Sequence, residues 1–130
     1  MSPYGAGLLI QRAQDGKVLL VYRADWLPHP NEWAAVGGYA EAGETPIQTA
    51  VREATEELGG IPRLSVMVEP FWQNVDGDFK FATFLAVMED EGALEPQLNE
   101  ENDDFGWFDP GQLPADTMPE TRRAIMELLR

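Results

Sequence analysis

Residues 38–60 read GYAEAGETPIQTAVREATEELGG and join a glycine turn to a well-marked helix rich in glutamate. The pattern predicts a helix over residues 46–58, because Thr45 suits the N-cap and Pro46 suits the first helical position. The glycine pair at 59–60 supplies the stop signal. Residues 46–58 are therefore expected to form a helix with defined ends.

The expected helix has an apolar face and an acidic face. The apolar stripe that we expect to face the core consists of Ile47, Ala50, Val51, Ala54 and Leu58. Glu53, Glu56 and Glu57 stand at positions i, i+3 and i+4, where like charges each weaken a helix by roughly 0.2–0.5 kcal/mol. Glu53 and Glu57 are expected to flank the core without entering it. A cation beside these carboxylates would relieve their repulsion.

Strands and a second helix surround this segment. Apolar stretches predict strands over 5–11, 17–24, 33–36, 63–73, 79–89 and 105–108, and a closing helix over 119–129. Asp15-Gly16 and residues 74–78 read as hairpin turns, and residues 90–104 read as an acidic loop. Strands that alternate with two helices predict a single α/β domain over residues 1–130 with a mixed sheet.

Composition restricts the function classes. The chain has 130 residues, no cysteine and a net charge of −14. Such a charge repels nucleic-acid backbones and anionic membranes, so we expect neither a polynucleotide nor a membrane as partner. Without a signal peptide or a long apolar segment in this sequence, a cytoplasmic location is expected. The oligomeric state stays open, a homodimer included.

The glutamate face suits a hard divalent cation. Several carboxylate oxygens on one rigid helix are the ligands that Mg²⁺ or Mn²⁺ prefers, and such ions commonly bridge to substrate phosphates. Residues 24–62 contain one Lys or Arg, Arg52, so side-chain cations alone would balance a polyphosphate poorly. Glu41 and Glu44 add carboxylates just before the helix.

The segment resembles the Nudix hydrolase family, whose box reads G-x5-E-x7-R-E-U-x-E-E-x-G-U with U a bulky apolar residue. The matching positions are Gly38, Glu44, Arg52, Glu53, Glu56, Glu57 and Gly59. Ala54 is a small residue at the first U position, and Gly60 departs from the pattern at the last one. The resemblance implies an α/β/α sandwich in which a mixed central sheet carries the box helix and a C-terminal helix.

The same resemblance implies roles for individual residues. Glu53, Glu56 and Glu57, with the Gly37 carbonyl, would be metal ligands. Arg52 would orient Glu53, and Glu44 would support the junction between loop and helix. The general base would be Glu53 or a carboxylate of residues 100–104, with Glu101 preferred. From its place at the end of a strand, Arg23 is a candidate for contacting the substrate phosphates, a surface ion pair being the alternative.

The implied reaction is hydrolysis of the diphosphate bond in a nucleoside diphosphate linked to a group X. Residues 71–81 lack the proline and tyrosine usual in members that act on ADP-ribose or dinucleoside polyphosphates. By elimination, the expected substrate is a (deoxy)nucleoside triphosphate, with ADP-ribose and other derivatives as alternatives. Two other function classes remain: a Nudix-like module that binds a nucleotide without cutting it, and an isomerase on the same scaffold, which the absence of cysteine disfavours.

Several further features have ordinary explanations. The Asp76-Gly77-Asp78 segment lacks the spacing of a calcium loop and reads as a hairpin turn. His29, the single histidine, reads as an exposed loop residue, although its loop is expected to border the site. The glutamate face itself would read as a solvated surface if spacing were the only evidence.

Overall fold

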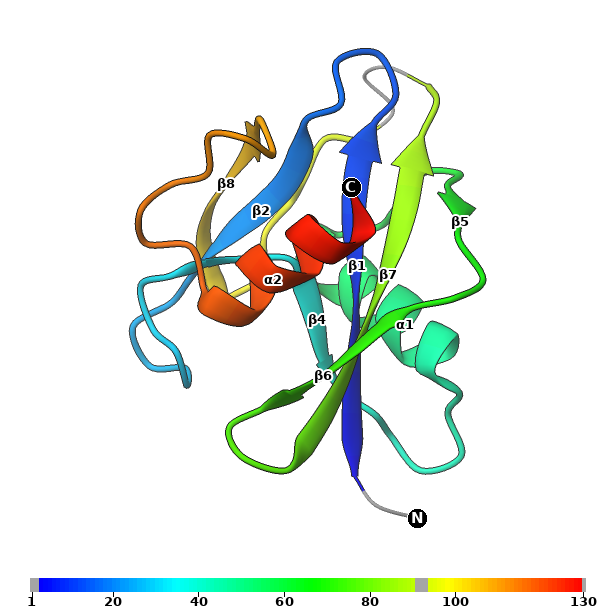
Figure 1. The fold of residues 1–130 in the computed structure, drawn as a ribbon, viewed down its shortest axis with the longest axis vertical. Helices are drawn as coiled ribbons and strands as arrows, with labels where there is room; N and C mark the ends of the chain where they lie inside the picture. The colour runs from blue at the N-terminus through cyan, green and yellow to red at the C-terminus, as the bar shows by residue number, and fades with distance from the viewer. Residues whose placement is uncertain (1–2, 91–93, 130) are drawn as a thin grey trace.

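The computed structural model describes residues 3–90 and 94–129 (Figure 1). Its elements are the strands β1 (Tyr4–Arg12), β2 (Val18–Arg23), β3 (Trp33–Ala34), β4 (Val36–Tyr39), β5 (Ser65–Val66), β6 (Phe71–Val75), β7 (Phe79–Met88) and β8 (Asn102–Phe108), and the helices α1 (Pro46–Leu58) and α2 (Pro119–Leu128). The predicted loop at 90–104 extends into residues 91–93, which lie outside the described residues.

The strands form one mixed sheet with two wings. In the first wing, β1 runs parallel to β7 over its full length and antiparallel to β4. In the second wing, β2 pairs antiparallel with β8 and β3. The predicted hairpin of β1 and β2 is present, but Gln11 and Val18 beside the turn are the paired positions, and β2 then diverges from β1 (Figure 1). The two wings therefore separate beyond this pair.

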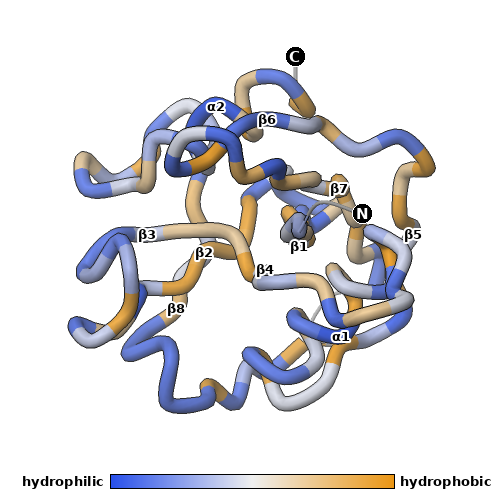
Figure 2. The backbone as a smooth tube through the Cα atoms, turned by 90° about the horizontal axis from the view of Figure 1, so that it is seen from below, coloured by the Kyte–Doolittle hydropathy of each residue, from blue (hydrophilic) through white to orange (hydrophobic). Residues whose placement is uncertain are grey.

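The two helices cover opposite faces of the sheet, as Figure 2 shows with α2 and α1 on either side of β1. Alternate residues of β1 separate the two cores, because successive side chains of a strand point to opposite faces. Leu8 and Ile10 pack with α1, whereas Leu9 packs in the core that contains Ile125 of α2. The mixed sheet between helices confirms the predicted fold class.

Helix α1 has the predicted ends. The Thr45 hydroxyl accepts from Gln48 N–H and the Gln48 side chain accepts from Thr45 N–H, which forms the capping box. Gly59 ends the helix with a left-handed φ of 74°. One predicted core position is wrong: Val51 is 37% exposed, because it lies at the edge of the apolar stripe.

Three predicted strands differ in their extent. Residues 63–73 do not form one strand, because the ladder along β7 breaks between β5 and β6, where Pro70 has no N–H to donate. The predicted strand over 33–36 divides at Ala35, where the chain leaves β2 and joins β1. The last strand begins at Asn102 rather than Phe105, because its acidic start pairs with β2 across a bulge.

The crossing from β3 into β4 depends on two facing glycines. Gly7 of β1 stands opposite Gly37 of β4. A Cβ on Gly7 would lie 2.3 Å from the Val36 carbonyl oxygen, and a Cβ on Gly37 would lie 2.7 Å from the Gly7 Cα. Backbone atoms cannot yield as a flexible side chain would, so glycine is required on both strands.

Replacing Gly7 by alanine should push β4 away from β1. Overpacking of this kind costs typically 1–3 kcal/mol, so the free energy of unfolding of Gly7→Ala in urea should fall by about 2 kcal/mol. Gly111→Ala is the matched control, since its Cβ would meet its nearest neighbour at 3.4 Å. Equal stability of the two variants would show that β4 shifts without strain.

Candidate active site

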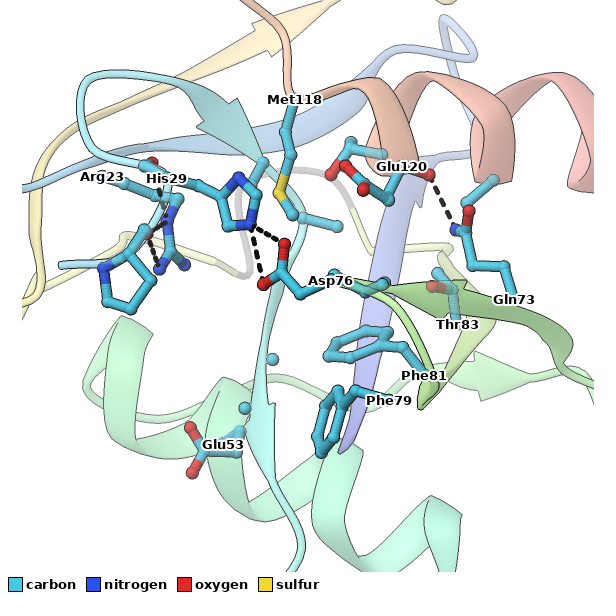
Figure 3. Close-up of a pocket in the computed structure, with 18 of the residues that line it drawn as sticks. Arg23, His29, Glu53, Gln73, Asp76, Phe79, Phe81, Thr83, Met118 and Glu120 are labelled. Carbon is cyan, nitrogen blue, oxygen red and sulfur yellow. Dashed lines mark hydrogen bonds and ion pairs between the residues drawn. The ribbon is translucent and has the colours of Figure 1, made fainter. Parts of the chain in front are cut away.

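A cavity of about 310 Å³ lies between the two wings of the sheet and reaches from α1 to α2 (Figure 3). Its lining comes from the loop that follows β2, from β4, from β6 and β7, and from both helices. Glu53 and Glu101 line the cavity near α1, together with Gly37 and Gly38. The cavity has the size of sites that bind small organic ligands.

Glu57 is the most deeply placed carboxylate of the helix face. Its side chain is 3% exposed, with one oxygen accepting from Gly37 N–H at 2.8 Å and the other from Asn102 Nδ2 at 2.9 Å. The expectation that Glu57 flanks the core without entering it is therefore wrong. Two N–H donors from β4 and β8 make its burial tolerable, because a buried carboxylate needs hydrogen-bond partners.

Burial nevertheless disfavours the charged form of this group. It raises the pKa of the Glu57 carboxyl to about 8, and the hydrogen bonds from Asn102 and Gly37 offset only part of the effect. The Glu53 and Glu101 carboxylates raise this pKa further. A group that is charged only above about pH 8 in this state would be held charged at neutral pH by a nearby cation.

Gly37 and Gly38 bring backbone close to these carboxylates. The Gly37 N–H donates to Glu57 and not to β1. In an antiparallel pair the N–H and C=O of one residue point to the same side of the strand, so the Gly37 carbonyl also faces away from β1. The Glu53 carboxylate packs on Gly38, where a Cβ would lie 2.2 Å from Glu53 Oε2. The glycine pair therefore leaves a space that the Glu53 carboxylate fills.

Arg52 connects the carboxylates before and along α1. Its Nη1 donates to Glu53 Oε1 at 2.8 Å and to Glu56 Oε1 at 3.3 Å. Its Nη2 also donates to the Tyr39 carbonyl of β4 at 2.9 Å. The contacts with Glu53 and Glu56 offset part of the repulsion along the helix face. The pKa of Arg52 is raised chiefly by its hydrogen bond to Glu44 and further by those to Glu53 and Glu56.

Glu44 anchors Arg52 from the other side. The carboxylate accepts from Arg52 Nε at 2.7 Å, from the Thr49 hydroxyl at 2.9 Å and from the Glu41 N–H at 2.8 Å. The hydrogen bond from Arg52 lowers the pKa of Glu44 to about 2, so this side chain is charged under all ordinary conditions. These contacts lie at the junction of loop and helix, where the resemblance places Glu44.

The predicted metal ligands are neighbours but are not yet gathered around one point. Across residues 3–90 and 94–129, no three His, Cys, Asp or Glu side chains converge as a ready ligand set. Glu53 and Glu56 turn toward Arg52, and Glu57 turns toward its amide donors. The oxygen donors still fit a hard divalent cation chemically. A shared ion would require these side chains to exchange their present partners for it.

The candidate base Glu101 lies in the same region. It lines the cavity, and its charge helps to raise the pKa of both Glu53 and Glu57. Burial is the main cause of the raised pKa of Glu53, whereas Arg52 lowers it. The two candidate bases, Glu53 and Glu101, thus line the same cavity.

Arg23 also lines the cavity, at the side of the loop that follows β2. Its guanidinium donates to the carbonyls of Pro28 and His29, so it holds this loop in place. His29 Nε2 lies 2.8 Å from Asp76 Oδ1 in the β6–β7 turn, and Figure 3 shows this pair beside the cavity. The lone histidine is therefore partnered, which the sequence did not indicate.

Sequence reasoning also missed Asn102. This side chain is 5% exposed, donates to Glu57, and leaves its own Oδ1 without a hydrogen-bond partner. A polar residue within the acidic run 100–104 looks like loop surface. No periodic pattern could have marked it, because Asn102 is buried while the next three residues of β8 are all exposed.

The chain is similar to known proteins over most of its length. A family model described as NUDIX domain matches residues 1–129. A putative 8-oxo-dGTP diphosphatase 3 of Mycobacterium tuberculosis is 39% identical over 111 residues, covering 80% of this chain and 51% of that protein. An NAD-capped RNA hydrolase NudC of Chromobacterium violaceum is 34% identical over 109 residues, covering 80% of this chain and 38% of that protein. The chain thus spans about half the length, or less, of these two relatives.

Solved structures show the same fold. An Ap4A hydrolase of C. elegans superposes with a TM-score of 0.81 at 22% identity, covering 96% of this chain and 95% of that one. The Nudix hydrolase RenU of M. smegmatis gives a TM-score of 0.74 at 26% identity, covering 97% and 83%. The box motif, the mixed sheet between two helices and the match over residues 1–129 agree, and the chain belongs to the Nudix family.

Proposed function

We propose that the protein is a metal-dependent diphosphohydrolase that cleaves a (deoxy)nucleoside triphosphate to the monophosphate. The observation that supports this proposal is a group of carboxylates and close-packed glycine backbone at one end of a cavity that is also lined by the rings of Phe79 and Phe81. This combination suits a ligand that is polyanionic at one end and carries a flat ring at the other.

The proposed metal ligands are the Gly37 carbonyl with Glu53, Glu56 and Glu57. Nudix hydrolases generally need a divalent metal ion, and we propose Mg²⁺, with Mn²⁺ as the alternative, because all the donors are hard oxygens. Such an ion supplies charge neutralisation at the phosphates and activates water. Arg52 is the nearby cation that Glu53 and Glu56 would exchange for the ion.

The side chains of this site suit attack by water on phosphorus. Water attacks one phosphorus of the diphosphate, the bond from that phosphorus to the bridging oxygen breaks, and a carboxylate accepts the proton of the water. Glu53 lines the cavity, and burial raises the pKa of its carboxyl, which makes it a better proton acceptor. Before an ion binds, Arg52 Nη1 holds Glu53 Oε1 at 2.8 Å. Glu101 is the second candidate for the proton acceptor.

A free nucleotide fits the charge of the chain better than a nucleic acid. The net charge of −14 disfavours long phosphate backbones, so an RNA cap is a poorer candidate than a triphosphate. The name of the mycobacterial relative, an 8-oxo-dGTP diphosphatase, points to the same substrate class. Arg23 is proposed to reach the phosphates once it leaves the Pro28 carbonyl.

The proposed reaction predicts that replacing either Glu53 or Glu57 by glutamine abolishes most of the turnover. Glu53→Gln should lower kcat by about 100-fold or more, since a positioned base contributes roughly 10²–10⁴-fold. Glu57→Gln should cause a comparable loss, because it removes a proposed metal ligand. Glu127→Gln, on the exposed side of α2, makes the same charge change and should keep full activity. Release of monophosphate from a nucleotide panel, followed by chromatography with Mg²⁺, gives the rates.

A wild-type protein that binds triphosphates tightly by calorimetry but releases no monophosphate over hours would contradict the proposal. That result would favour the binding module, and the engagement of Glu53 and Glu56 with Arg52 would then be their working arrangement.

A second prediction concerns pH and metal. The Glu57 carboxyl has a pKa of about 8 in the folded state and about 4.5 when unfolded, so the folded state binds more protons between these values. Without metal, stability should therefore fall as the pH rises from 5 to 8, by about 2 kcal/mol or more for this group. Mg²⁺ should reduce the decline, because it binds the charged form.

Urea unfolding at several pH values, in EDTA and in Mg²⁺, measures this effect. The quantity to compare is the difference in free energy of unfolding between the wild type and Glu57→Gln, because the variant lacks the titrating group while keeping the other carboxylates. A difference that is constant from pH 5 to 8 in EDTA would show that Glu57 keeps its ordinary pKa.

A further inference from the structure

A contact between two loops joins the two wings of the sheet at the cavity. His29 belongs to the loop between β2 and β3, and Asp76 belongs to the turn between β6 and β7. His29 Nε2 lies 2.8 Å from Asp76 Oδ1 and 3.0 Å from Oδ2, as the dashed lines in Figure 3 show. Both residues line the cavity, and their side chains are 28% and 61% exposed, so the pair lies at the rim of the cavity.

The Asp76 side of this contact is held by the sheet. Val75 and Phe79 pair in the β6–β7 ladder, so the turn between them consists of residues 76–78 alone. Asp76 and Gly77 have φ angles of 54° and 87°, which Asp and Gly adopt more readily than most residues. A turn that is this short and is closed by a ladder pair has little freedom, so Asp76 is the fixed member of the pair.

The His29 side lies on a loop without regular secondary structure, residues 24–32. His29 has a left-handed φ of 55°, which is uncommon for a residue with a Cβ. The Arg23 guanidinium donates to the carbonyls of Pro28 and His29 at 3.0 Å and 3.1 Å. The loop is thus held largely by side-chain contacts, and His29 is the member of the pair that can move.

A second acceptor lies beside the other ring nitrogen of His29. Glu32 Oε1 is 3.6 Å from His29 Nδ1, which is too far for a hydrogen bond. This oxygen is buried and has no hydrogen-bond partner within residues 3–90 and 94–129. An unpaired buried acceptor is unfavourable, and either ring nitrogen of a histidine can donate. A small movement of the ring would therefore exchange Asp76 for Glu32 as the partner.

We propose that the His29–Asp76 contact is a latch on the cavity. In the closed state, His29 holds its loop against the β6–β7 turn. In the open state, the ring turns to Glu32 and the loop leaves the turn, which admits a nucleotide. Partly exposed pairs contribute little to stability, so this contact opens at small cost while it still favours the closed state. The inference rests on the proposed function for the identity of the ligand.

The latch can be tested without any ligand, because the chain has no cysteine. Thr83→Cys places a single thiol on the cavity wall, at a position that is 4% exposed, and its labelling by iodoacetamide measures how often the cavity opens. His29→Asn and Asp76→Gly in this background should each raise the labelling rate by about two- to fivefold, as expected for the loss of a partly exposed pair. Both replacements tolerate a positive φ, so the backbone keeps its conformation.

Glu32→Ala should have the opposite effect, because it removes the partner of His29 in the open state. The labelling rate of the Thr83→Cys protein should then fall by about twofold or more. Asp25→Asn is the matched control and should leave the rate unchanged, since Asp25 is exposed on the same loop and does not line the cavity. Thermal unfolding checks the fold, since general loosening would speed labelling in every variant, Glu32→Ala included.

Binding kinetics test the role of the latch in nucleotide entry. The probe is a mant-labelled α,β-methylene analogue of dGTP, which is not cleaved between the α and β phosphorus atoms, with Mg²⁺ in stopped flow. The association and dissociation rate constants should both rise by about two- to fivefold in His29→Asn and in Asp76→Gly. Loss of a simple contact with the ligand would raise the dissociation rate constant alone.

The outcomes separate this inference from the proposed function. Unchanged labelling in His29→Asn and Asp76→Gly would overturn the latch and leave the hydrolase standing. An unchanged association rate constant for an analogue that binds would overturn the latch as well. If no nucleotide is bound or cleaved, the proposed function fails, and the labelling rates decide the latch alone.

Discussion

The buried Glu57 carboxylate is the interaction on which the arrangement of the site depends. It joins three parts of the fold, because its oxygens accept from Gly37 of β4 and Asn102 of β8 while its backbone belongs to α1. β4 belongs to the wing built on β1, and β8 belongs to the wing built on β2. One side chain therefore links the two wings, and its burial between them raises the pKa of the carboxyl.

Both ends of the cavity follow from how the two helices are held. Helix α1 is anchored by Ala50, Ala54 and Leu58, which turns its glutamates toward β4 and the cavity. Helix α2 is anchored on the opposite core through Ala124 and Ile125, which leaves its first turn at the other end. Glu53 of α1 and Glu120 of α2 thus line one cavity from helices on opposite faces of the sheet.

No helix of the described residues has the length and apolar character to span a membrane.

Much of this could be predicted from sequence, and the exceptions share a physical reason. Local signals determine the caps of α1, the hairpin turns and the presence of the two helices, and these expectations were correct. The other features depend on tertiary contacts. The acidic residues at the start of β8 form a strand because they pair with β2. Glu57 is buried because Gly37 N–H and Asn102 Nδ2 donate hydrogen bonds to it. Gln73 and Glu120 lie 47 residues apart in sequence and belong to no motif, so only the fold could bring the Gln73 amide to the Glu120 backbone carbonyl.

Arg52 relieves the repulsion along the acidic face without a divalent ion. It is the one Lys or Arg in residues 24–62, and it contacts Glu44, Glu53 and Glu56 at once. Glu44 is not among the proposed metal ligands, so it can keep Arg52 in place when Glu53 and Glu56 turn to an ion. An arginine held only by the ligands would lose every partner on metal binding and would oppose it. The contacts of Glu44 with Thr49 and Arg52 do not involve the proposed ligands, so they would remain if Glu53 and Glu56 turned to an ion.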